Sequence, residues 1–199
     1  MDSPIDRIKQ LVDALPAGLQ AHIYRARKIA LELAAQHGVD PERAGLGILA
    51  HDIARAMTGA GLVRRAIELG LQIGPVERQM PVLLYGPVGA EILRVEESMD
   101  DPPIHNAVYW HTTGHASLDT LGKVVFLADK LDPQKITRYP YQPQLHRLAM
   151  EDLDWAMLEF LTREMVSLTT QAQLVHPAMV DARNALLLAA STRRPSVEE

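Results

Sequence analysis

The sequence predicts an all-α protein. Aromatic residues make up only 5% of the chain, and Ala, Leu, Glu and Arg dominate its long segments. The alternation of apolar and polar residues that marks a half-buried strand is absent. With 199 residues, 47% of them hydrophobic, the chain can bury a full core. We therefore expect residues 1–199 to form a single helical domain.

The first half of the chain contains three predicted helices. The first spans about residues 16–37 and ends at Gly38, a residue suited to the left-handed conformation just past a helix end. Asp40 is a suitable N-cap for the second helix, which has a proline at its first position and spans about 41–55. This helix carries the segment ILAHDIARAM. A glycine-rich loop then leads to a third helix over about 62–69.

The second half of the chain is predicted to be helical as well. The segment DTLGKVVFLADKL is apolar nearly all round, which is typical of a helix surrounded by other helices. Residues 191–199 are expected to form a disordered tail. The predicted helices of this half span about 86–97, a segment that starts at Pro102 and contains HNAVYWHTTG, 119–131, one long helix over 145–173, and 177–190.

Composition narrows the classes of function. The chain has no cysteine, which excludes disulfides, thiolate metal sites and a cysteine nucleophile and leaves histidine and carboxylate as metal ligands. A net charge of −5 argues against broad binding of a nucleic-acid polymer. No signal peptide and no membrane span is expected, so the sequence predicts a cytoplasmic protein.

Five ionisable side chains fall where helical spacing predicts the core. His51 and Asp52 stand side by side in ILAHDIARAM, which is otherwise almost entirely apolar. His22 lies within the apolar stripe of the first helix, His111 points to the same face as the apolar residues before it, and Asp129 ends the run VVFLAD. A buried ionised carboxylate costs several kcal/mol unless it is compensated. Each of these positions therefore needs a partner.

A metal ion satisfies all five together. A single inward histidine is more often a hydrogen-bonded core residue than a ligand. Two carboxylates and three histidines that face one interior, however, need mutual compensation. A divalent cation provides it, because it binds neutral imidazole and ionised carboxylate. The sequence therefore predicts a metal site formed by His22, His51, Asp52, His111 and Asp129.

This ordered set resembles the HD-domain superfamily of metal-dependent phosphohydrolases. The segments LAHDIAR, LLYGPVGAEIL, HTTG and VVFLADKLDP are similar to those of the YqeK family, which hydrolyses diadenosine tetraphosphate symmetrically. The resemblance covers about residues 17–139. It implies an HD-type helical core there, followed by C-terminal helices over about 145–190.

The resemblance also implies a division of the ligands. In YqeK-like proteins the residues that match His22, His51, Asp52 and Asp129 hold one metal, usually iron. Iron is therefore the metal expected for this protein, with Mn, Co or Mg as alternatives. Asp52 can bridge to a second ion, for which His111 matches a ligand. The implied cofactor is therefore one or two divalent ions.

Tyr85 departs from the family pattern. It stands in LLYGPVGAE, where the family has a histidine that serves as the other ligand of the second metal. A neutral tyrosine, with an ordinary pKa of about 10, is a poor ligand unless the metal itself lowers that pKa. Three outcomes follow: a mononuclear active site, a dinuclear site completed by Tyr85 or water, or an impaired catalyst.

The implied reaction is hydrolysis of a phosphoanhydride. Attack of water on an inner phosphate of a four-phosphate chain gives two nucleoside diphosphates, with Asp52 or His111 taking the proton of the water. The expected catalytic residues are Asp52, His111 and Arg55, and the expected substrate contacts are Lys130, Lys135, Thr112 and Tyr85. Lys135 replaces an arginine of the family, which exchanges a two-pronged fork for a point charge.

Two alternatives to this function remain open. One is a nucleotidase or pyrophosphohydrolase of the wider HD group that acts on another phosphate ester. The other is a nucleotide-binding sensor in which Tyr85 has impaired turnover.

The apolar positions of the late helices, including Trp155, are expected in the core or in a homodimer interface. His146 and His176 are expected at the surface.

Overall fold

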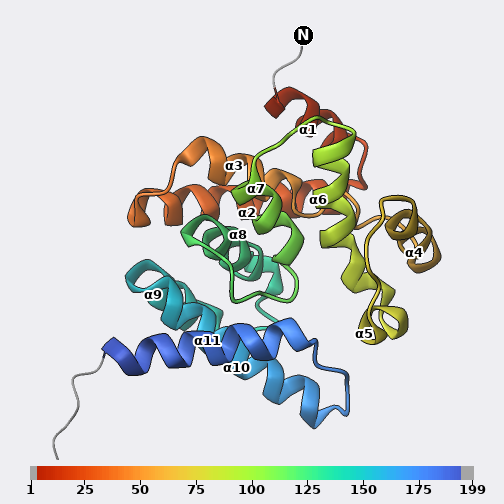
Figure 1. Ribbon diagram of the computed structural model, residues 1–199. Coiled ribbons are helices and arrows are strands. Elements are labelled where there is room, and N and C mark those ends of the chain that lie inside the picture. The colour runs from red at the N-terminus through yellow and green to blue at the C-terminus, as the bar shows by residue number, and fades with distance from the viewer. Residues whose placement is uncertain (1–3, 194–199) are drawn as a thin grey trace, which may run out of the picture.

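The computed structural model describes residues 4–193, and every regular element in this range is a helix (Figure 1). The prediction of an all-α protein is therefore confirmed. The elements in chain order, with η marking 3₁₀ turns, are α1 (Pro4–Asp13), α2 (Ala17–His37), α3 (Pro41–Ala50), α4 (Gly59–Glu68), α5 (Pro75–Gln79), η1 (Pro81–Leu84), α6 (Tyr85–Val95), α7 (Pro102–Trp110), α8 (Thr120–Lys130), η2 (Pro133–Lys135), α9 (Gln142–Glu151), α10 (Leu153–Thr170) and α11 (Pro177–Arg193).

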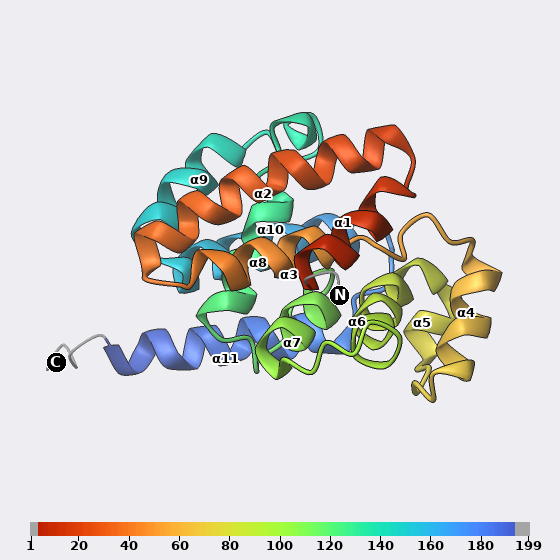
Figure 2. The ribbon, with the colours of Figure 1, turned by 90° about the horizontal axis from the view of Figure 1, so that it is seen from above.

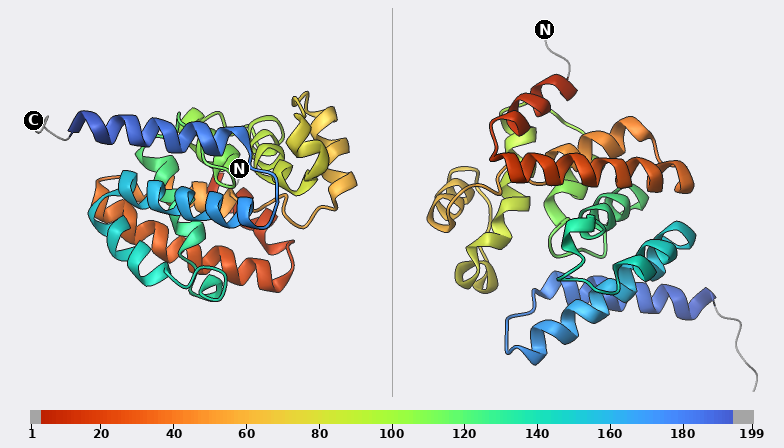
Figure 3. Two further views of the ribbon diagram at one scale, coloured as in Figure 1. Left: turned by 90° about the horizontal axis from the view of Figure 1, so that it is seen from below. Right: turned by 180° about the vertical axis from the view of Figure 1, so that it is seen from behind.

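Helix α8 is the centre of the bundle. It packs against α2, α3, α7 and α10, so that helices surround it as its apolar sequence predicted (Figure 1). Val124, Val125, Phe126 and Leu127 on this helix are fully buried. The last three helices, α9, α10 and α11, lie on one side of α8 in the view from behind (Figure 3, right). Asp129 lies in the last turn of this central helix and is thus held in the middle of the molecule.

The helix boundaries in the first half follow local chemistry. Gly38 adopts a left-handed conformation with φ of 66° and ends α2, as predicted. Asp40 accepts a hydrogen bond from the backbone N–H of Glu42 and caps α3. The short helix α1 was not predicted; its Ile8 and Val12 are buried in the core, and α1 packs against α3.

Helix α3 ends earlier than the sequence predicted. It stops at Ala50 instead of continuing to residue 55, and residues 51–56 form successive turns. The Nδ1 atom of His51 lies 2.6 Å from the carbonyl oxygen of Ile48 and takes over a backbone acceptor at the helix end. The chain therefore turns at the His51–Asp52 pair, which places both side chains in the interior.

The prediction of one long helix over residues 145–173 is wrong. The backbone breaks at Asp152, where φ is −152° and ψ is 111°, and separates α9 from α10. The Asp152 side chain accepts hydrogen bonds from the backbone N–H groups of Asp154 and Trp155, so it caps a new helix. Helix α11 continues to Arg193, and the rest of the predicted tail lies outside the described residues.

Two hydrophobic clusters meet at the turn after α3. The larger cluster surrounds α8 and includes Ala50, whereas the smaller one includes Ala54 and Tyr85 and lies beneath α4 and α6. Viewed from above, α4 and α5 stand at one end of the molecule (Figure 2). The His51–Asp52 pair therefore lies at the junction of the two clusters. Across residues 4–193, no helix has both the length and the apolar character that crossing a membrane requires.

Candidate metal centre

The five side chains that the sequence singled out meet in the interior. His22 comes from α2, His51 and His111 directly follow α3 and α7, and Asp129 comes from the end of α8. The His51 ring centroid lies 5.4 Å from that of His22 and 4.9 Å from that of His111. His22 is 9% exposed, and His51, Asp52, His111 and Asp129 are exposed by 4% or less. Four helices thus bring residues distant in the sequence to one buried point.

Two of the histidines have their tautomers fixed by the backbone. The Nδ1 atom of His51 lies 2.6 Å from the carbonyl oxygen of Ile48, and that of His111 lies 2.7 Å from the carbonyl oxygen of Val108. Because a carbonyl oxygen only accepts, each Nδ1 must carry the hydrogen. In the neutral imidazole the Nε2 lone pair of His51 then faces Asp52 and Asp129, and that of His111 faces Asp52.

The Nε2 atoms and the carboxylate oxygens form a tight cluster. His51 Nε2 lies 3.3 Å from Asp52 Oδ2 and 3.6 Å from Asp129 Oδ1. His22 Nε2 lies 3.0 Å from Asp129 Oδ1, and His111 Nε2 lies 3.6 Å from Asp52 Oδ1. Two groups, His22–His51–Asp129 and His51–Asp52–His111, each offer ligand atoms within 4.8 Å of one another. His51 belongs to both groups.

Unpaired polar atoms show that this cluster suits a cation. Within the described part of the chain, His51 Nε2 and Asp52 Oδ1 are buried and have no hydrogen-bond partner. A buried acceptor without a partner costs about 1–3 kcal/mol. A divalent ion bound between these atoms satisfies both, because imidazole nitrogen and carboxylate oxygen are ligands for divalent transition metals. The residues present therefore fit a metal site.

The charges of the cluster shift its pKa values strongly. Burial alone lowers the pKa of His51, but Asp52 and Asp129 raise it to about 9. Without a metal the ring is therefore protonated at pH 7, and a bound cation would take the place of the Nε2 proton. Burial lowers the pKa of His111 to about 4, so this ring is neutral at pH 7. Burial opposes ionisation of both carboxyl groups. Nevertheless, His51 holds the pKa of Asp52 well below its usual range. Lys130 and Lys135 do the same for the pKa of Asp129. The carboxylates are therefore ionised and ready to hold a cation.

The two lysines that the sequence predicted as substrate contacts lie beside Asp129. Lys130 Nζ donates to Asp129 Oδ2 at 2.6 Å and to the carbonyl oxygen of His111 at 2.8 Å. Its side chain is buried, and this burial lowers its pKa. Lys135 Nζ donates to Asp129 Oδ1, and its side chain is partly exposed. Lys130 therefore holds Asp129 in place from within the interior, and Lys135 is the more accessible of the two lysines to a ligand.

Tyr85 stands against the same centre at the start of α6. Its ring centroid lies 5.1 Å from that of His111, and the Arg55 guanidinium lies 4.7 Å above the ring. Tyr85 is 3% exposed, and burial raises its pKa far above 10. The side chain is therefore a neutral phenol. The Nη1 atom of Arg55 lies 3.9 Å from Asp52 Oδ1, so the guanidinium also faces the centre.

A cavity of about 330 Å³ leads to the centre. Asp129, Tyr85 and Thr112 line its inner end. Its cationic lining residues are Arg55, Lys130, Lys135 and Arg138. The apolar part of its wall comes from residues before α6, from α10 and α11 and from the loop between these two helices. It includes Met80, Leu83, Phe160, Leu168, Leu174 and Met179. The cavity thus combines positive charge near the carboxylates with an apolar wall.

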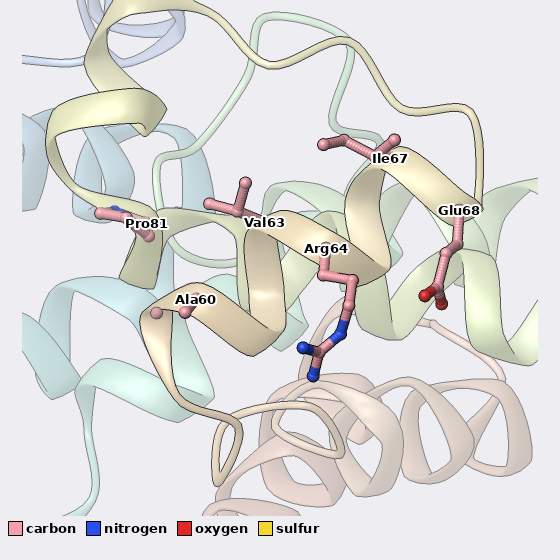
Figure 4. Close-up of a pocket in the computed structure, with 7 residues that line it drawn as sticks. Ala60, Val63, Arg64, Ile67, Glu68 and Pro81 are labelled. Atoms are coloured by element: carbon pink, nitrogen blue, oxygen red, sulfur yellow. The ribbon is translucent and has the colours of Figure 1, made fainter.

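A second hollow, of about 460 Å³, has no connection with this chemistry. It lies along α4 and is lined by Val63, Arg64, Ile67 and Glu68 together with Pro81 and two small residues (Figure 4). None of the candidate metal ligands lines it. The cavity that contains Asp129 is therefore the one that bears on function.

Sequence reasoning missed several residues of the site. Asp132 contacts His22 on the side of the ring away from Asp129, with its Oδ2 atom 2.6 Å from His22 Nδ1. His176, expected at the surface, instead lines the cavity and lies 3.0 Å from Glu77 through its Nε2 atom. Glu164 also lines the cavity and accepts a hydrogen bond from Arg138 at 2.8 Å. Only the Asp-Pro pair at residue 132 carried a local signal, and it indicated a turn.

The fold and the centre together define a class: a helical protein equipped to bind a divalent metal ion through imidazole and carboxylate groups. Residues 19–134 match the family model described as the HD domain, and the chain belongs to this family. The match covers α2 through η2, the part of the chain that supplies all five candidate ligands.

Relatives resemble the chain over most of its length. It is 28% identical over 173 residues to the symmetrical bis(5'-nucleosyl)-tetraphosphatase of Halalkalibacterium halodurans. This match covers 84% of this chain and 88% of that protein. It is also 28% identical over 156 residues to the Bacillus subtilis protein of the same name, covering 78% and 82% of the two chains. The crystal structure of a predicted HD superfamily hydrolase involved in NAD metabolism from Clostridium acetobutylicum is similar with a TM-score of 0.88 at 25% identity, covering 95% of this chain and 99% of that one.

Proposed function

We propose that the protein is a metal-dependent hydrolase that cleaves dinucleoside tetraphosphates symmetrically into two nucleoside diphosphates. One observation carries this proposal: a buried centre of three imidazoles and two carboxylates adjoins a cavity with four cationic side chains. Such a cavity suits a polyanionic ligand. The symmetrical tetraphosphatases that resemble the chain over most of its length support the choice of substrate.

The first metal ion would be held by His22, His51, Asp52 and Asp129, and Asp52 with His111 would hold a second. We propose iron as the native metal, with Mn, Co or Mg as alternatives, since imidazole and carboxylate ligands accept several divalent ions. The bound metal supplies Lewis acidity toward a phosphoryl oxygen and makes a water molecule acidic enough to attack at neutral pH.

The protein groups around the centre handle protons and phosphate charge. His111 is neutral at pH 7 because burial lowers its pKa to about 4, so His111 or the ionised Asp52 can accept a proton from the attacking water. Arg55 and Lys135 are the accessible cations nearest the carboxylates, and they would neutralise charge on the phosphates and the leaving diphosphate. Thr112 Oγ1, 3.3 Å from His111 Nε2, can donate a hydrogen bond to a phosphate oxygen.

Tyr85 makes a mononuclear active site the favoured arrangement. A neutral phenol is a weak ligand compared with an imidazole, so the position beside His111 lacks a strong second donor. The hydroxyl of Tyr85 would instead bind a phosphate oxygen together with Arg55. The same substitution is the one observation that favours a second candidate, a nucleotide sensor that binds the ligand and turns it over slowly.

Product analysis tests the proposed function. The purified protein is stripped of metal, loaded in turn with Fe, Mn, Co or Mg, and incubated with diadenosine tetraphosphate. We expect two ADP per substrate with at least one metal and no turnover after chelation. AMP plus ATP would contradict symmetrical cleavage. Tight binding of the nucleotide without turnover by any metal-loaded form would favour the sensor.

A further inference from the structure

We infer that Asp132, held in place by Arg25, is a positioning residue that fixes the tautomer of His22 and so keeps its Nε2 lone pair directed at the metal centre. Asp132 is neither among the candidate metal ligands nor a residue that lines the substrate cavity. The inference rests on the metal centre of the proposed function and assigns that centre a further supporting element.

His22 lies between two carboxylates that compete for one hydrogen. Its Nδ1 atom lies 2.6 Å from Asp132 Oδ2, and its Nε2 atom lies 3.0 Å from Asp129 Oδ1. A neutral imidazole carries a single N–H and can donate to only one of them. If Nδ1 carries the hydrogen, the Nε2 lone pair is free for a metal. If Nε2 carries it, His22 donates to Asp129 and is lost as a ligand.

The surroundings of Asp132 favour the first arrangement. Its carboxylate is immobilised, because Oδ1 accepts from Arg25 Nε at 2.7 Å and Oδ2 accepts from Arg25 Nη2 at 2.8 Å. The backbone N–H of Gln134 also donates to Oδ1, at 3.2 Å. Asp132 is 1% exposed, so water does not compete for these oxygens. Asp129, in contrast, already accepts hydrogen bonds from Lys130 and Lys135.

The position of His22 in its helix explains why a side chain, and not the backbone, accepts the hydrogen of its Nδ1 atom. His51 and His111 come directly after the last residues of α3 and α7, where backbone carbonyls are free to accept from Nδ1. His22 lies inside α2, where each carbonyl oxygen already accepts an intrahelical hydrogen bond. His22 therefore has no free carbonyl oxygen of the kind that accepts from His51 and His111. Asp132 supplies it from the turn after α8.

The substitution Asp132→Asn reverses the hydrogen bonding without changing the size of the side chain. The amide oxygen is expected at the position of Oδ1, where both Arg25 Nε and the Gln134 N–H donate, because the opposite orientation would set the NH₂ group against these two donors. The NH₂ group then faces His22 and, of the donors, only Arg25 Nη2. His22 Nδ1 must then accept, and the hydrogen moves to Nε2. We expect nitrogen NMR of the metal-free protein, recorded at a pH at which the His22 ring is neutral, to show His22 as the Nδ1–H tautomer in the unmodified protein and as the Nε2–H tautomer in Asp132→Asn. Because such supporting groups are worth about 10–100-fold in metal affinity, Co²⁺ binding should weaken by about that factor.

A matched control is available elsewhere in the fold. Glu91 is a buried carboxylate that also joins an arginine and a histidine, with Arg94 at 2.6 Å and His105 at 2.9 Å. Glu91→Gln should leave Co²⁺ affinity unchanged. Asp132→Asn with the original tautomer and the original Co²⁺ affinity would overturn the inference.

A second variant keeps the test informative if Asp132→Asn does not fold. Arg25 is partly exposed, and Arg25→Gln removes the fork but leaves Asp132 in place. It should weaken Co²⁺ binding severalfold, and unchanged affinity would contradict the role of Arg25. The tautomer is read in metal-free protein, so it reports on Asp132 even if the unmodified protein binds no Co²⁺, a result that would count against the proposed function alone.

Discussion

His51 Nε2 and Asp52 Oδ1 are buried polar atoms that the described part of the protein leaves without a hydrogen-bond partner, although they lie at the centre of the bundle. Buried polar atoms without a partner are costly, and the binding of a cation accounts for these two. The groups around them have separate roles, since backbone carbonyls orient His51 and His111 and a side chain, that of Asp132, orients His22.

Tyr85 is the residue whose replacement should change the metal content. Tyr85→His places an imidazole beside His111 and Asp52, and we expect it to add a second metal ion per chain and to raise turnover severalfold. Tyr85→Phe is the control, because it removes the hydroxyl and adds no ligand. Elemental analysis of both variants measures the stoichiometry. Equal metal content in Tyr85→His and in the unmodified protein would count against a ligand position here.

The sequence predicted the residues of the centre better than their supports. His22, His51, Asp52, His111 and Asp129 could be found because helical spacing places each on an apolar face, where an ionisable group is an anomaly. Asp132 could not be found in this way, because an aspartate before a proline is the usual mark of a turn. Its bond to His22 depends on the packing of α2 against α8, which no local pattern reveals.

At the scale of helices, close packing of α6 on α7 sets the position of His111. A Cβ atom at Gly86 would lie 2.8 Å from the carbonyl oxygen of Tyr109 and 3.3 Å from His111 Cε1. Helix α6 can approach α7 this closely only without a side chain at that point. Helix α6 also places Glu91 against His105 of α7.

Gly86→Ala should therefore disturb both the fold and the centre. Overpacking of this kind typically costs about 1–3 kcal/mol, and the displacement of His111 should weaken metal binding. Denaturant unfolding and a Co²⁺ titration measure the two effects. Gly18→Ala, also in a helix but with nothing within 4 Å of the added Cβ, is the control and should not destabilise the protein. Equal stabilities of the two variants would contradict the close contact.

The contact between α6 and α7 should also give part of the stability a pH dependence. Burial opposes ionisation of Glu91, but Arg94 and His105 lower its pKa below the ordinary value. A carboxyl whose pKa is lower in the folded protein stabilises the fold above its unfolded pKa, about 4.3, and loses that contribution as the pH falls through its folded pKa. Glu91→Gln should therefore cost up to about 1 kcal/mol at pH 7, with the difference shrinking below pH ~4. A difference that grows on acidification would have the wrong sign.

The boundaries of the helices were predictable only where a residue gives a strong local signal. Gly38 and Asp40 end α2 and begin α3 as expected. The break at Asp152 was missed because the surrounding sequence favours a helix on both sides and contains neither glycine nor proline. Glu164 reaches the cavity from α10, and His176 reaches it from the residue just before α11. Their positions depend on how these two helices pack, which the local sequence does not reveal.

At the scale of the whole molecule, the centre joins helices that are far apart in the chain. The candidate ligands lie in α2 and α8 and directly after α3 and α7, and these four helices contribute to the larger hydrophobic cluster. A metal bound there links these helices in the folded state and has no preformed site in the unfolded chain. The proposed single domain and the proposed homodimer remain predictions; Trp155 is half-exposed and available for such an interface.

Removal of the metal should lower the stability of the entire domain. A ligand that binds only the folded state stabilises it by about 2.7 kcal/mol when present at a hundredfold excess over its dissociation constant. Chelation should therefore lower the unfolding midpoint by several degrees, and added Co²⁺ should restore it. His51→Ala, which lacks a ligand of the first metal, should show no such response to chelation. An identical response in that variant would place the stabilising ion elsewhere.

The most direct test of the account is an anomalous difference map from crystals of the Co-loaded protein. The account predicts a peak about 2.0–2.2 Å from His51 Nε2 and from an oxygen of Asp52, distances typical of divalent metal sites. A map with its peak away from His22, His51, Asp52 and Asp129, in a protein that still hydrolyses the nucleotide, would contradict the account.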